Sequence, residues 1–231
     1  MGKVDDAGQV GQPPAPADPT EPHAPKRIVE QGYDRVAARH LTWSAGVRQD
    51  ERLRYAQELL SRLPNGARVL ELGCGQGTPT TKLLAQRFAV TGVDISASQL
   101  ELARREAPKA TFIHADMASL SFPERGFDGV AAFYSLIHVP REEHAGLLAR
   151  IAGWLRPGGL LVATMGVRDA PGEVEDDWLG APMFFSHWDA ATNRALVEQA
   201  GLRIISAREE TADEDGAPVT FLWIVAEKPQ A

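Results

Sequence analysis

Three glycines at every second position, directly after a short apolar segment, constrain this chain more than any other feature. The stretch from Arg68 to Thr81 reads RVLELGCGQGTPTT, with Gly73, Gly75 and Gly77 after the apolar residues. Glycine takes positive φ at little cost and has no Cβ, so such a turn brings bare backbone close to a ligand. The pattern predicts a strand, a ligand-binding turn and a helix start, where exposed N–H groups attract an anion or a carboxylate.

The composition is that of an ordinary globular protein and disfavours several functions. With 231 residues, 44% hydrophobic and 24% charged, the chain has the size of one α/β domain. A net charge of −7 gives no basic footprint for nucleic acid or an anionic membrane, and we predict neither partner. Cys74 is the single cysteine, so neither a disulfide framework nor a cysteine-rich metal site is available, and we predict no metal.

The location of the protein follows from what the sequence lacks. No apolar run reaches the roughly 18 to 20 residues that a membrane span needs. The start, MGKVDDAGQV, lacks the basic and apolar regions of a signal peptide. We therefore expect a cytoplasmic protein, and no feature of the sequence indicates an oligomeric state.

The N-terminal part divides into a tail and a helical region. Residues 1–25 contain GQPPAPADPTEPHAP, which is rich in proline and nearly free of large apolar groups, so we expect a disordered tail there. The folded domain should then cover residues 26–231. Apolar residues at helical spacing predict helices over 26–44 and 48–63. We expect these helices, residues 26–63, to form a lid on the domain.

Strands and helices alternate through the middle of the chain. The predicted strands cover 69–72, 89–93, 111–114, 127–133 and 160–164, and the helices between them 79–87, 97–106 and 142–155. Buried apolar strands between amphipathic helices indicate an α/β fold with a parallel sheet covered on both faces. At the end of the chain a helix over 188–200 precedes strands over 202–208 and 219–227, joined by a polar loop. This pattern predicts a terminal hairpin with an antiparallel last strand.

Acidic residues stand at the ends of the first three predicted strands, and open parallel sheets bind ligands at that edge. These residues are Glu71, Asp94 and Asp116. A carboxylate at the position of Asp94 can accept both hydroxyls of a ribose, and Ile95 can pack on a base. Asp116 can accept from an adenine amino group, and the backbone N–H of Met117 can donate to a ring nitrogen.

Together these segments resemble the class I S-adenosylmethionine-dependent methyltransferases. The first motif of that family, an acidic residue followed by GxGxG, is matched by ELGCGQG at residues 71–77. The further matches are VTGVDIS (90–96), HADM (114–117), FDGVAAFYSLIHVP (127–140) and LRPGGLLV (155–162). The resemblance covers about residues 26–228. It implies a Rossmann-like three-layer αβα sandwich with a seven-stranded, mostly parallel sheet, an antiparallel last strand, and S-adenosyl-L-methionine as the cofactor.

The resemblance also implies a set of cofactor-binding residues. It places Tyr33 of the N-terminal helix over the methionine end of the cofactor, with ordinary core packing as the alternative, and the backbone carbonyl of Phe133 against the sulfonium. The expected set consists of Tyr33, Glu71, Gly73, Gly75, Gly77, Asp94, Ile95, Asp116, Met117 and Phe133.

The candidates for catalysis and acceptor binding come from two other segments. Methyl transfer depends on positioning, and a general base is needed only if the acceptor loses a proton. His138 follows the fourth strand and has a near-neutral reference pKa, so it is a candidate base, with a structural role equally open. Tyr134 either lines the methyl pocket or packs. His187 and Trp188 either contact the substrate or mark the start of the next helix.

Two acidic runs, residues 173–177 and 209–215, are predicted to form loops at the same edge of the sheet. They are either solvated loop tips or an acidic rim that steers a cationic acceptor toward the site.

The predicted function is methyl transfer to an oxygen or nitrogen atom of a small molecule, because a helical lid without a large inserted domain favours a small acceptor. The competing interpretation is an NAD(P)-dependent oxidoreductase with a Rossmann fold, whose fingerprint is GxGxxG. Here the third glycine comes one residue early, and a pyrophosphate site leaves Asp116 unexplained. A noncatalytic nucleotide-binding regulator is the third alternative.

Overall fold

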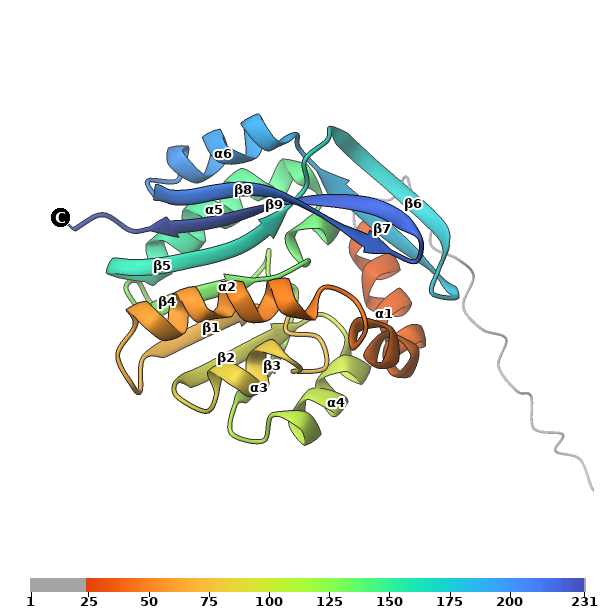
Figure 1. The fold of residues 1–231 in the computed structure, drawn as a ribbon, viewed down its shortest axis with the longest axis horizontal. Helices are drawn as coiled ribbons and strands as arrows, with labels where there is room; N and C mark the ends of the chain where they lie inside the picture. The colour runs from red at the N-terminus through yellow and green to blue at the C-terminus, as the bar shows by residue number, and fades with distance from the viewer. Residues whose placement is uncertain (1–23, 231) are drawn as a thin grey trace, which may run out of the picture.

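The computed structural model describes residues 24–230. The predicted tail falls on residues outside this range except for its last two positions. Helix α1, Ala24–Ser44, begins at these two residues, slightly before the expected boundary of the folded domain (Figure 1). Within the described residues, no helix combines the length and the apolar character needed to cross a membrane.

A seven-stranded sheet forms the centre of the molecule, with the strand order β3-β2-β1-β4-β5-β9-β8 (Figure 1). The strands are β1 Arg68–Leu72, β2 Ala89–Asp94, β3 Thr111–His114, β4 Phe127–Ala132, β5 Leu155–Met165, β8 Arg203–Glu214 and β9 Ala217–Glu227. Strands β1 to β5 pair in parallel, and β9 runs antiparallel to both β5 and β8. The prediction of a mostly parallel sheet with a reversed last strand is confirmed.

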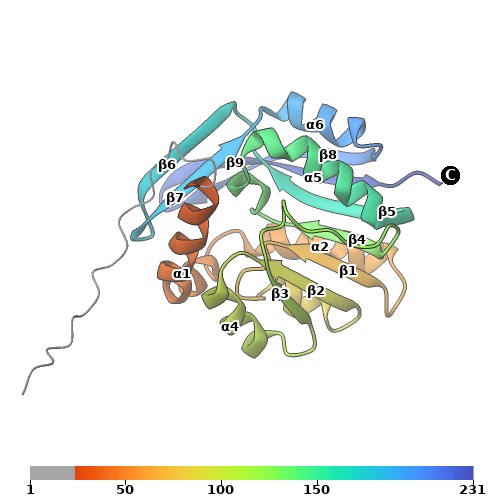
Figure 2. The ribbon, with the colours of Figure 1, turned by 180° about the vertical axis from the view of Figure 1, so that it is seen from behind.

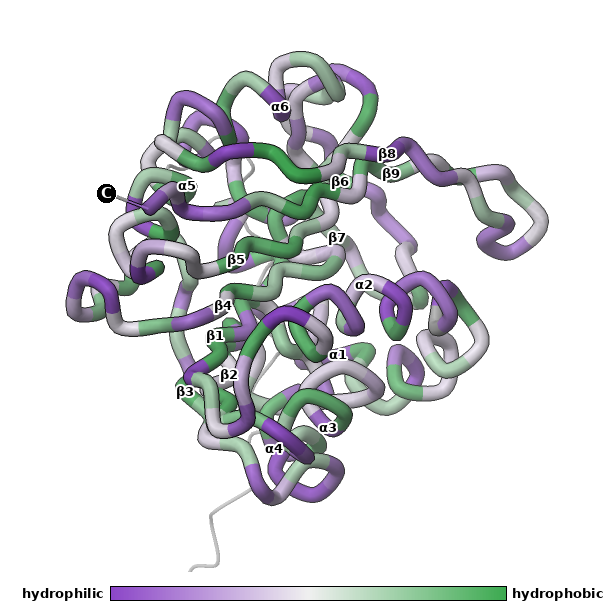
Figure 3. Tube along the Cα trace, turned by 60° about the vertical axis from the view of Figure 1, so that its left-hand side comes forward, coloured by the Kyte–Doolittle hydropathy of each residue, from purple (hydrophilic) through white to green (hydrophobic). Residues whose placement is uncertain are grey.

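Helices cover both faces of this sheet (Figures 1 and 2). They are α2 Gln49–Arg62, α3 Thr80–Leu84 and α4 Ala97–Glu106 on one face, and α5 Arg141–Trp154 and α6 Ala190–Gln199 on the other. Successive strand residues point to opposite faces, so a strand covered on both sides must be apolar at every position. Figure 3 shows this hydrophobic character along the central strands. The predicted three-layer sandwich is confirmed.

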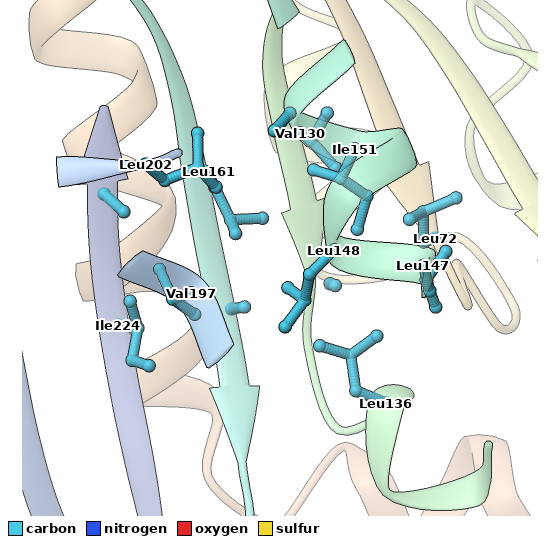
Figure 4. Close-up of a cluster of buried hydrophobic side chains, with 14 of the residues drawn as sticks. Leu72, Val130, Leu136, Leu147, Leu148, Ile151, Leu161, Val197, Leu202 and Ile224 are labelled. Carbon is cyan, nitrogen blue, oxygen red and sulfur yellow. The ribbon is translucent and has the colours of Figure 1, made fainter. Parts of the chain in front are cut away.

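The two apolar layers divide the strand side chains between them. Figure 4 shows Leu148 and Ile151 of α5 packed near Val130 and Leu161, all of them at most 1% exposed. On the opposite face, Leu59 of α2 belongs to the cluster that fills the space above the alternate strand positions. Of the two N-terminal helices, α2 thus packs into a sheet layer, and α1 lies beside the carboxyl edge.

A second, two-stranded sheet packs against α1. It consists of β6, Ala170–Trp178, and β7, Ala181–His187, paired in antiparallel register. Residues 173–177 lie in β6, so the prediction of a loop there is wrong. Gly32 of α1 lets the helix approach β7, because a Cβ at this position would lie 2.6 Å from the Pro182 carbonyl oxygen and 2.9 Å from Met183 Cε.

The hairpin of β8 and β9 is longer than predicted. Its ladder continues to the pair Glu214 and Ala217, so most of the expected polar loop is strand. The end of this ribbon projects beyond the body of the molecule in Figure 3 and meets the junction of α1 and α2. There Arg48 forms an ion pair with Glu214, and Trp43 Nε1 donates to Asp215 Oδ2 at 2.9 Å.

The second acidic run is therefore largely paired. Arg194 pairs with Glu209, Arg54 pairs with Glu210, and Arg48 pairs with Glu214. Because these carboxylates already hold cations of the same chain, the ribbon does not form the free acidic rim that would steer a cationic acceptor.

Candidate active site

A cavity lies at the carboxyl ends of β1, β2 and β4, beneath α1. Open parallel sheets bind their ligands at this edge, where the strand order reverses on either side of β1. Ten of the predicted site residues line the cavity: Tyr33, Glu71, Gly73, Gly75, Asp94, Ile95, Met117, Phe133, Tyr134 and His138. The structure thus brings together residues from the N-terminal helix and from four strand ends.

The glycine turn leaves bare backbone at one point of the cavity wall. Gly73, Gly75 and Gly77 all have positive φ, at 71°, 53° and 78°. A Cβ on Gly73 would overlap Ser135, and one on Gly77 would lie 3.1 Å from Ala103 Cα. These two glycines serve the packing of the turn, and Gly77 does not line the cavity. Gly75 has open space instead, since its nearest neighbour would be 3.9 Å away, so its backbone is the part that a ligand can approach.

Asp94 is held in one orientation by the backbone around it. Its Oδ2 accepts from the Gly75 N–H at 2.8 Å and its Oδ1 from the Ser96 N–H at 2.9 Å. Burial outweighs these two hydrogen bonds and raises the pKa of Asp94 to about 6. A carboxylate with lone pairs left over, fixed at the end of β2, can accept hydroxyl groups of a ligand.

Glu71 is a second buried carboxyl in the same cavity. Its side chain accepts from the Thr81 hydroxyl at 2.6 Å, and burial raises its pKa to about 8. A buried carboxylate of this kind gains from a cation that offsets its desolvation. The residue is therefore suited to hold an ammonium group.

His138 and Tyr33 form a hydrogen-bonded pair at the cavity. His138 ends the 3₁₀ helix η1, Leu136–His138, and its Nδ1 lies 2.8 Å from the Phe184 carbonyl oxygen. Because a carbonyl only accepts, Nδ1 carries the proton, and Nε2 accepts from the Tyr33 hydroxyl at 2.8 Å. Burial lowers the pKa of His138 to about 4, which keeps the ring neutral near pH 7. Tyr33 and His138 thus line the cavity as one hydrogen-bonded unit.

Several lining residues were missed by the sequence analysis. Gln76 Nε2 donates to Ser44 Oγ at 2.6 Å, and Gln76 Oε1 lies 3.0 Å from His40 Nδ1, so the glycine turn is tied to α1. Arg52 of α2 places Cζ 4.7 Å from the Tyr134 ring centroid. His40 and Arg52 come from helices whose sequence shows amphipathic spacing alone, without a motif that could mark them.

Asp116 lies beside the main cavity. It lines a smaller, apolar cavity together with Ile95 and Met117, both of which also line the main one. Its carboxylate accepts from Lys26 Nζ at 2.8 Å and from Ser119 Oγ at 2.7 Å. Burial would raise the pKa of Asp116, but its hydrogen bonds, that from Lys26 foremost, outweigh burial and lower it.

His187 and Trp188 lie away from the cavity. His187 Nδ1 is 2.6 Å from the Arg168 carbonyl oxygen, and Trp188 Nε1 donates to the Arg141 carbonyl at 3.1 Å. The next helix begins at Ala190, with Asp189 as its N-cap, so neither residue starts it. Both side chains hold the connection between β7 and α6, and the structure does not bring them to the predicted acceptor site.

The fold and the cavity define a class of protein. The donor and acceptor set consists of two buried carboxyls, open glycine backbone between them and an apolar wall beyond. This set fits a ligand that carries an ammonium group, neighbouring hydroxyls and a planar ring, which are the parts of S-adenosylmethionine. The class is that of Rossmann-like proteins for adenosine ligands with an amino-acid end.

Comparison with known proteins narrows this class to a family. Residues 69–159 match the family model described as a methyltransferase domain. A trans-aconitate 2-methyltransferase of Delftia acidovorans is 39% identical over 78% of this chain and 70% of the relative. One of Variovorax paradoxus is 43% identical over 51% of this chain and 46% of its own length. The chain thus spans about half of several relatives that it matches.

A solved structure gives the same answer for the fold. The 1,6-didemethyltoxoflavin-N1-methyltransferase of Burkholderia thailandensis, with bound S-adenosylhomocysteine, is 22% identical, covers 94% of each chain and has a TM-score of 0.69. This chain belongs to the class I S-adenosylmethionine-dependent methyltransferases, and the cofactor of that family is S-adenosyl-L-methionine.

Proposed function

We propose that this chain transfers a methyl group from S-adenosylmethionine to an oxygen or nitrogen atom of a small molecule. The observation that carries the proposal is the pair of buried carboxyls, Glu71 and Asp94, which line one cavity together with the open backbone of Gly75. An NAD(P)-dependent enzyme would share the ribose carboxylate at the position of Asp94, but its cofactor has no ammonium group for a buried carboxyl such as Glu71 to hold.

Six residues of the chain would hold the cofactor. Glu71 faces the ammonium group, and Arg52 in the same cavity faces the carboxylate of the methionine end. Asp94 accepts the ribose hydroxyls. Ile95 and Met117 pack on the adenine, while Asp116 and the Met117 N–H stand at its edge.

The other residues that line the cavity would act in the methyl-transfer step. When bound, S-adenosylmethionine would supply a methyl group on a positively charged sulfur; the acceptor lone pair would bond to the methyl carbon as the bond from that carbon to sulfur breaks, with S-adenosylhomocysteine as the leaving group. Tyr134 and Phe133 narrow the cavity and exclude water, which favours near-attack geometry. An acceptor that loses a proton passes it to the Tyr33 oxygen, whose own proton moves to His138 Nε2. His138 thus acts as a base through Tyr33, which also contacts the methionine end.

The limited space for the acceptor supports the proposal that the acceptor is a small molecule. Helix α1 and the sheet of β6 and β7 pack together over the carboxyl edge and so limit the space beside the cavity. The relatives are named for trans-aconitate, a small molecule, and the structural neighbour for methylation at N1 of its substrate. Both kinds of name support an acceptor of this size.

Calorimetry with S-adenosylhomocysteine, S-adenosylmethionine and NAD(P)H tests the cofactor assignment. We expect binding of the first two and none of the third. The protein is then incubated with S-adenosylmethionine and an acceptor library, and products are read by mass. Binding of NAD(P)H without the other two would overturn the proposal in favour of the oxidoreductase. Binding without any methylated product would favour a regulator.

A further inference from the structure

A second cavity adjoins the first on the side away from the glycine turn. Its wall shares Tyr33, His40, Arg52, Tyr134 and His138 with the cofactor cavity, so the two spaces meet at these residues. The rest of its wall comes from the end of the β8–β9 ribbon, from the α1–α2 junction and from β6 and β7. It includes Trp43, Arg48, Trp178, Phe185, Glu214 and Phe221.

Arg48 stands at the far end of this second cavity with a free donor. Its side chain is only 1% exposed. The Nε atom donates to Glu214, and Nη2 donates to the Val219 carbonyl oxygen. The Nη1 atom is buried and finds no acceptor among the described residues. A buried donor left without a partner costs free energy, more when it is charged, so a ligand or water molecule that supplies an acceptor here is stabilised.

Tyr134 adds a second free donor beside it. Its φ is 54°, a conformation that a bulky residue rarely adopts, and this turns the ring toward both cavities. The hydroxyl is buried and makes no hydrogen bond of normal geometry among residues 24–230, although the Arg48 guanidinium beside it acts on it. The ring lies 6.0 Å from Arg48 Cζ. Burial raises the pKa of Tyr134, so the hydroxyl is a donor near neutral pH.

Aromatic rings form the side walls. Trp43 and Trp178 meet edge to face with ring centroids 5.7 Å apart, and the Phe185 ring lies 4.8 Å from that of His138. Phe221 packs at 5.0 Å against Tyr134 and holds Arg48 Cζ over its face at 4.9 Å. Walls of this kind suit a flat, mostly apolar group.

We infer that the second cavity binds the acceptor, and that the acceptor is a flat carboxylic acid. Its carboxylate accepts from Arg48 Nη1 and from the Tyr134 hydroxyl, and its body lies between the aromatic rings. The atom that receives the methyl group is at the opposite end, near Tyr33 and His138, where the two cavities meet. The inference rests on the proposed function and adds the chemical class of the acceptor to it.

Charge in the second cavity supports an anion over a cation. Glu214 is the acidic residue of its wall, and the Arg48 Nε already donates to it. The free groups are donors, and Arg52, which lines both cavities, adds a further positive charge. A cationic acceptor would meet two guanidinium groups and leave both free donors unused.

The test compares acids with their uncharged amides. Calorimetry in saturating S-adenosylhomocysteine measures the binding of cinnamate, 4-hydroxycinnamate and trans-aconitate, each against the matching amide. We expect the wild type to bind at least one acid more than about 10-fold more tightly than its amide. Tyr134→Phe deletes only the free hydroxyl and should weaken that acid roughly 10-fold, and Arg48→Met should weaken it roughly 100-fold, as lost hydrogen bonds to a charged group predict. The affinity for the amide should change far less.

Two control variants separate binding from folding. Tyr55→Phe removes a hydroxyl that donates to Glu210, and Arg54→Met removes an exposed partner of the same carboxylate; neither residue lines the cavity. Both should leave acid binding unchanged. Arg48→Met also loses contacts to the ribbon, so Tyr134→Phe decides the matter if that variant does not fold.

The failure of this inference is distinct from the failure of the proposed function. If the wild type binds S-adenosylhomocysteine but no acid better than its amide, the inference is overturned and the methyltransferase assignment stands. If Tyr134→Phe binds the acid as tightly as the wild type does, the inference is overturned as well. The hydroxyl would then have a water molecule, not the acid, as its partner. If S-adenosylhomocysteine itself does not bind, both fail.

Discussion

The site has two halves that the protein builds in different ways. The cofactor half is made of the glycine turn and the ends of β1 and β2, and its contacts join residues close in sequence or on paired strands. Asp94 and Gly75, for example, are 19 residues apart. The acceptor half joins the ends of the chain: Arg48 and Glu214 are 166 residues apart, and Trp43 and Asp215 are 172 apart.

This difference has consequences for both specificity and stability. Backbone N–H groups and strand ends are fixed by the central sheet, so the cofactor half changes little when a surface segment changes. The acceptor half depends on α1, the β6–β7 hairpin and the tip of the β8–β9 ribbon, none of which belongs to the parallel core. Variation in these segments can alter the acceptor while the cofactor site stays intact.

The largest effect is expected from Asp94→Ala, in the cofactor half. The change removes the acceptor of the ribose hydroxyls and leaves the Gly75 and Ser96 N–H groups without their partner. The ribose hydroxyls would lose the two hydrogen bonds that they donate to this charged group. That loss predicts a decrease in S-adenosylhomocysteine affinity of roughly 100-fold or more. Calorimetry measures this loss. Asp128→Ala is the control, because Asp128 is also buried and accepts from the Arg68 N–H at the opposite end of β1. Unchanged affinity in Asp94→Ala would mean that the ligand binds elsewhere.

A smaller, pH-dependent effect is expected from Glu71→Gln. Burial raises the pKa of Glu71 in the folded protein to about 8, above its ordinary value of 4.5. The folded state therefore holds more protons than the unfolded state between these values, and its free energy of unfolding falls as the pH rises through them. Glu71→Gln removes this contribution. The variant should gain stability relative to wild type between about pH 5 and about pH 8, as measured by urea unfolding.

Glu71 should also make the affinity for the cofactor rise with pH, whereas it makes the free energy of unfolding fall. An ammonium group binds the ionised carboxylate, so the affinity of wild type for S-adenosylhomocysteine should rise as the pH rises toward about 8. In Glu71→Gln the slope should disappear, with affinity near pH 8 reduced roughly 10-fold. A wild-type affinity that is flat across this range would show that Glu71 does not meet the ammonium group.

A change of a few fold in kcat/KM is expected from a substitution where α1 meets the acceptor half. Gly32→Ala places a methyl group 2.6 Å from the Pro182 carbonyl oxygen and should push α1 away from β7. Overpacking of this kind costs about 1–3 kcal/mol of stability and should lower kcat/KM several-fold. Gly153→Ala is the matched control, since it is also a helix glycine but has nothing within 4 Å. It should stabilise the protein by up to about 1 kcal/mol without changing kcat/KM. Equal behaviour of the two variants would contradict the close approach of α1 to β7.

The extent to which the sequence predicted the structure follows the same division. The strand ends that carry Glu71 and Asp94 are marked by apolar runs and by a glycine turn, and both signals act within a few residues. They therefore predicted the sheet and the residues of the cavity wall at these strand ends, whereas Tyr33 and Phe133 followed from the resemblance to the family. Residues 173–177 were predicted as a loop because this acidic run follows the fifth strand at the edge of the sheet. They form a strand because β7 pairs with them in an antiparallel ladder, and no local pattern encodes that pairing.

The residues that were missed or misplaced share one physical cause. Arg48, Arg52 and Trp178 acquire their roles from neighbours far away in the sequence, so their own segments show nothing but amphipathic or polar character. His187 and Trp188 had the composition of a binding segment, but their ring nitrogens are engaged with backbone carbonyls of the chain. A short motif predicts chemistry only where backbone geometry, and not tertiary contact, sets the site.

The smallest effect is expected from Lys26→Met, at the boundary between the two halves. Lys26 of α1 donates to Asp116 at 2.8 Å and to Glu143 at 2.7 Å, so it ties the lid to the edge of the cofactor half. The three side chains are 20%, 21% and 37% exposed, and partly exposed ion pairs of this kind contribute under about 1 kcal/mol. Its loss frees the Asp116 carboxylate for the adenine amino group, which offsets the loosened lid. We expect S-adenosylhomocysteine affinity to change less than about 3-fold, and less still at high salt. A 10-fold loss would show instead that the cofactor half depends on the lid as strongly as the acceptor half does, and the two could not be varied independently.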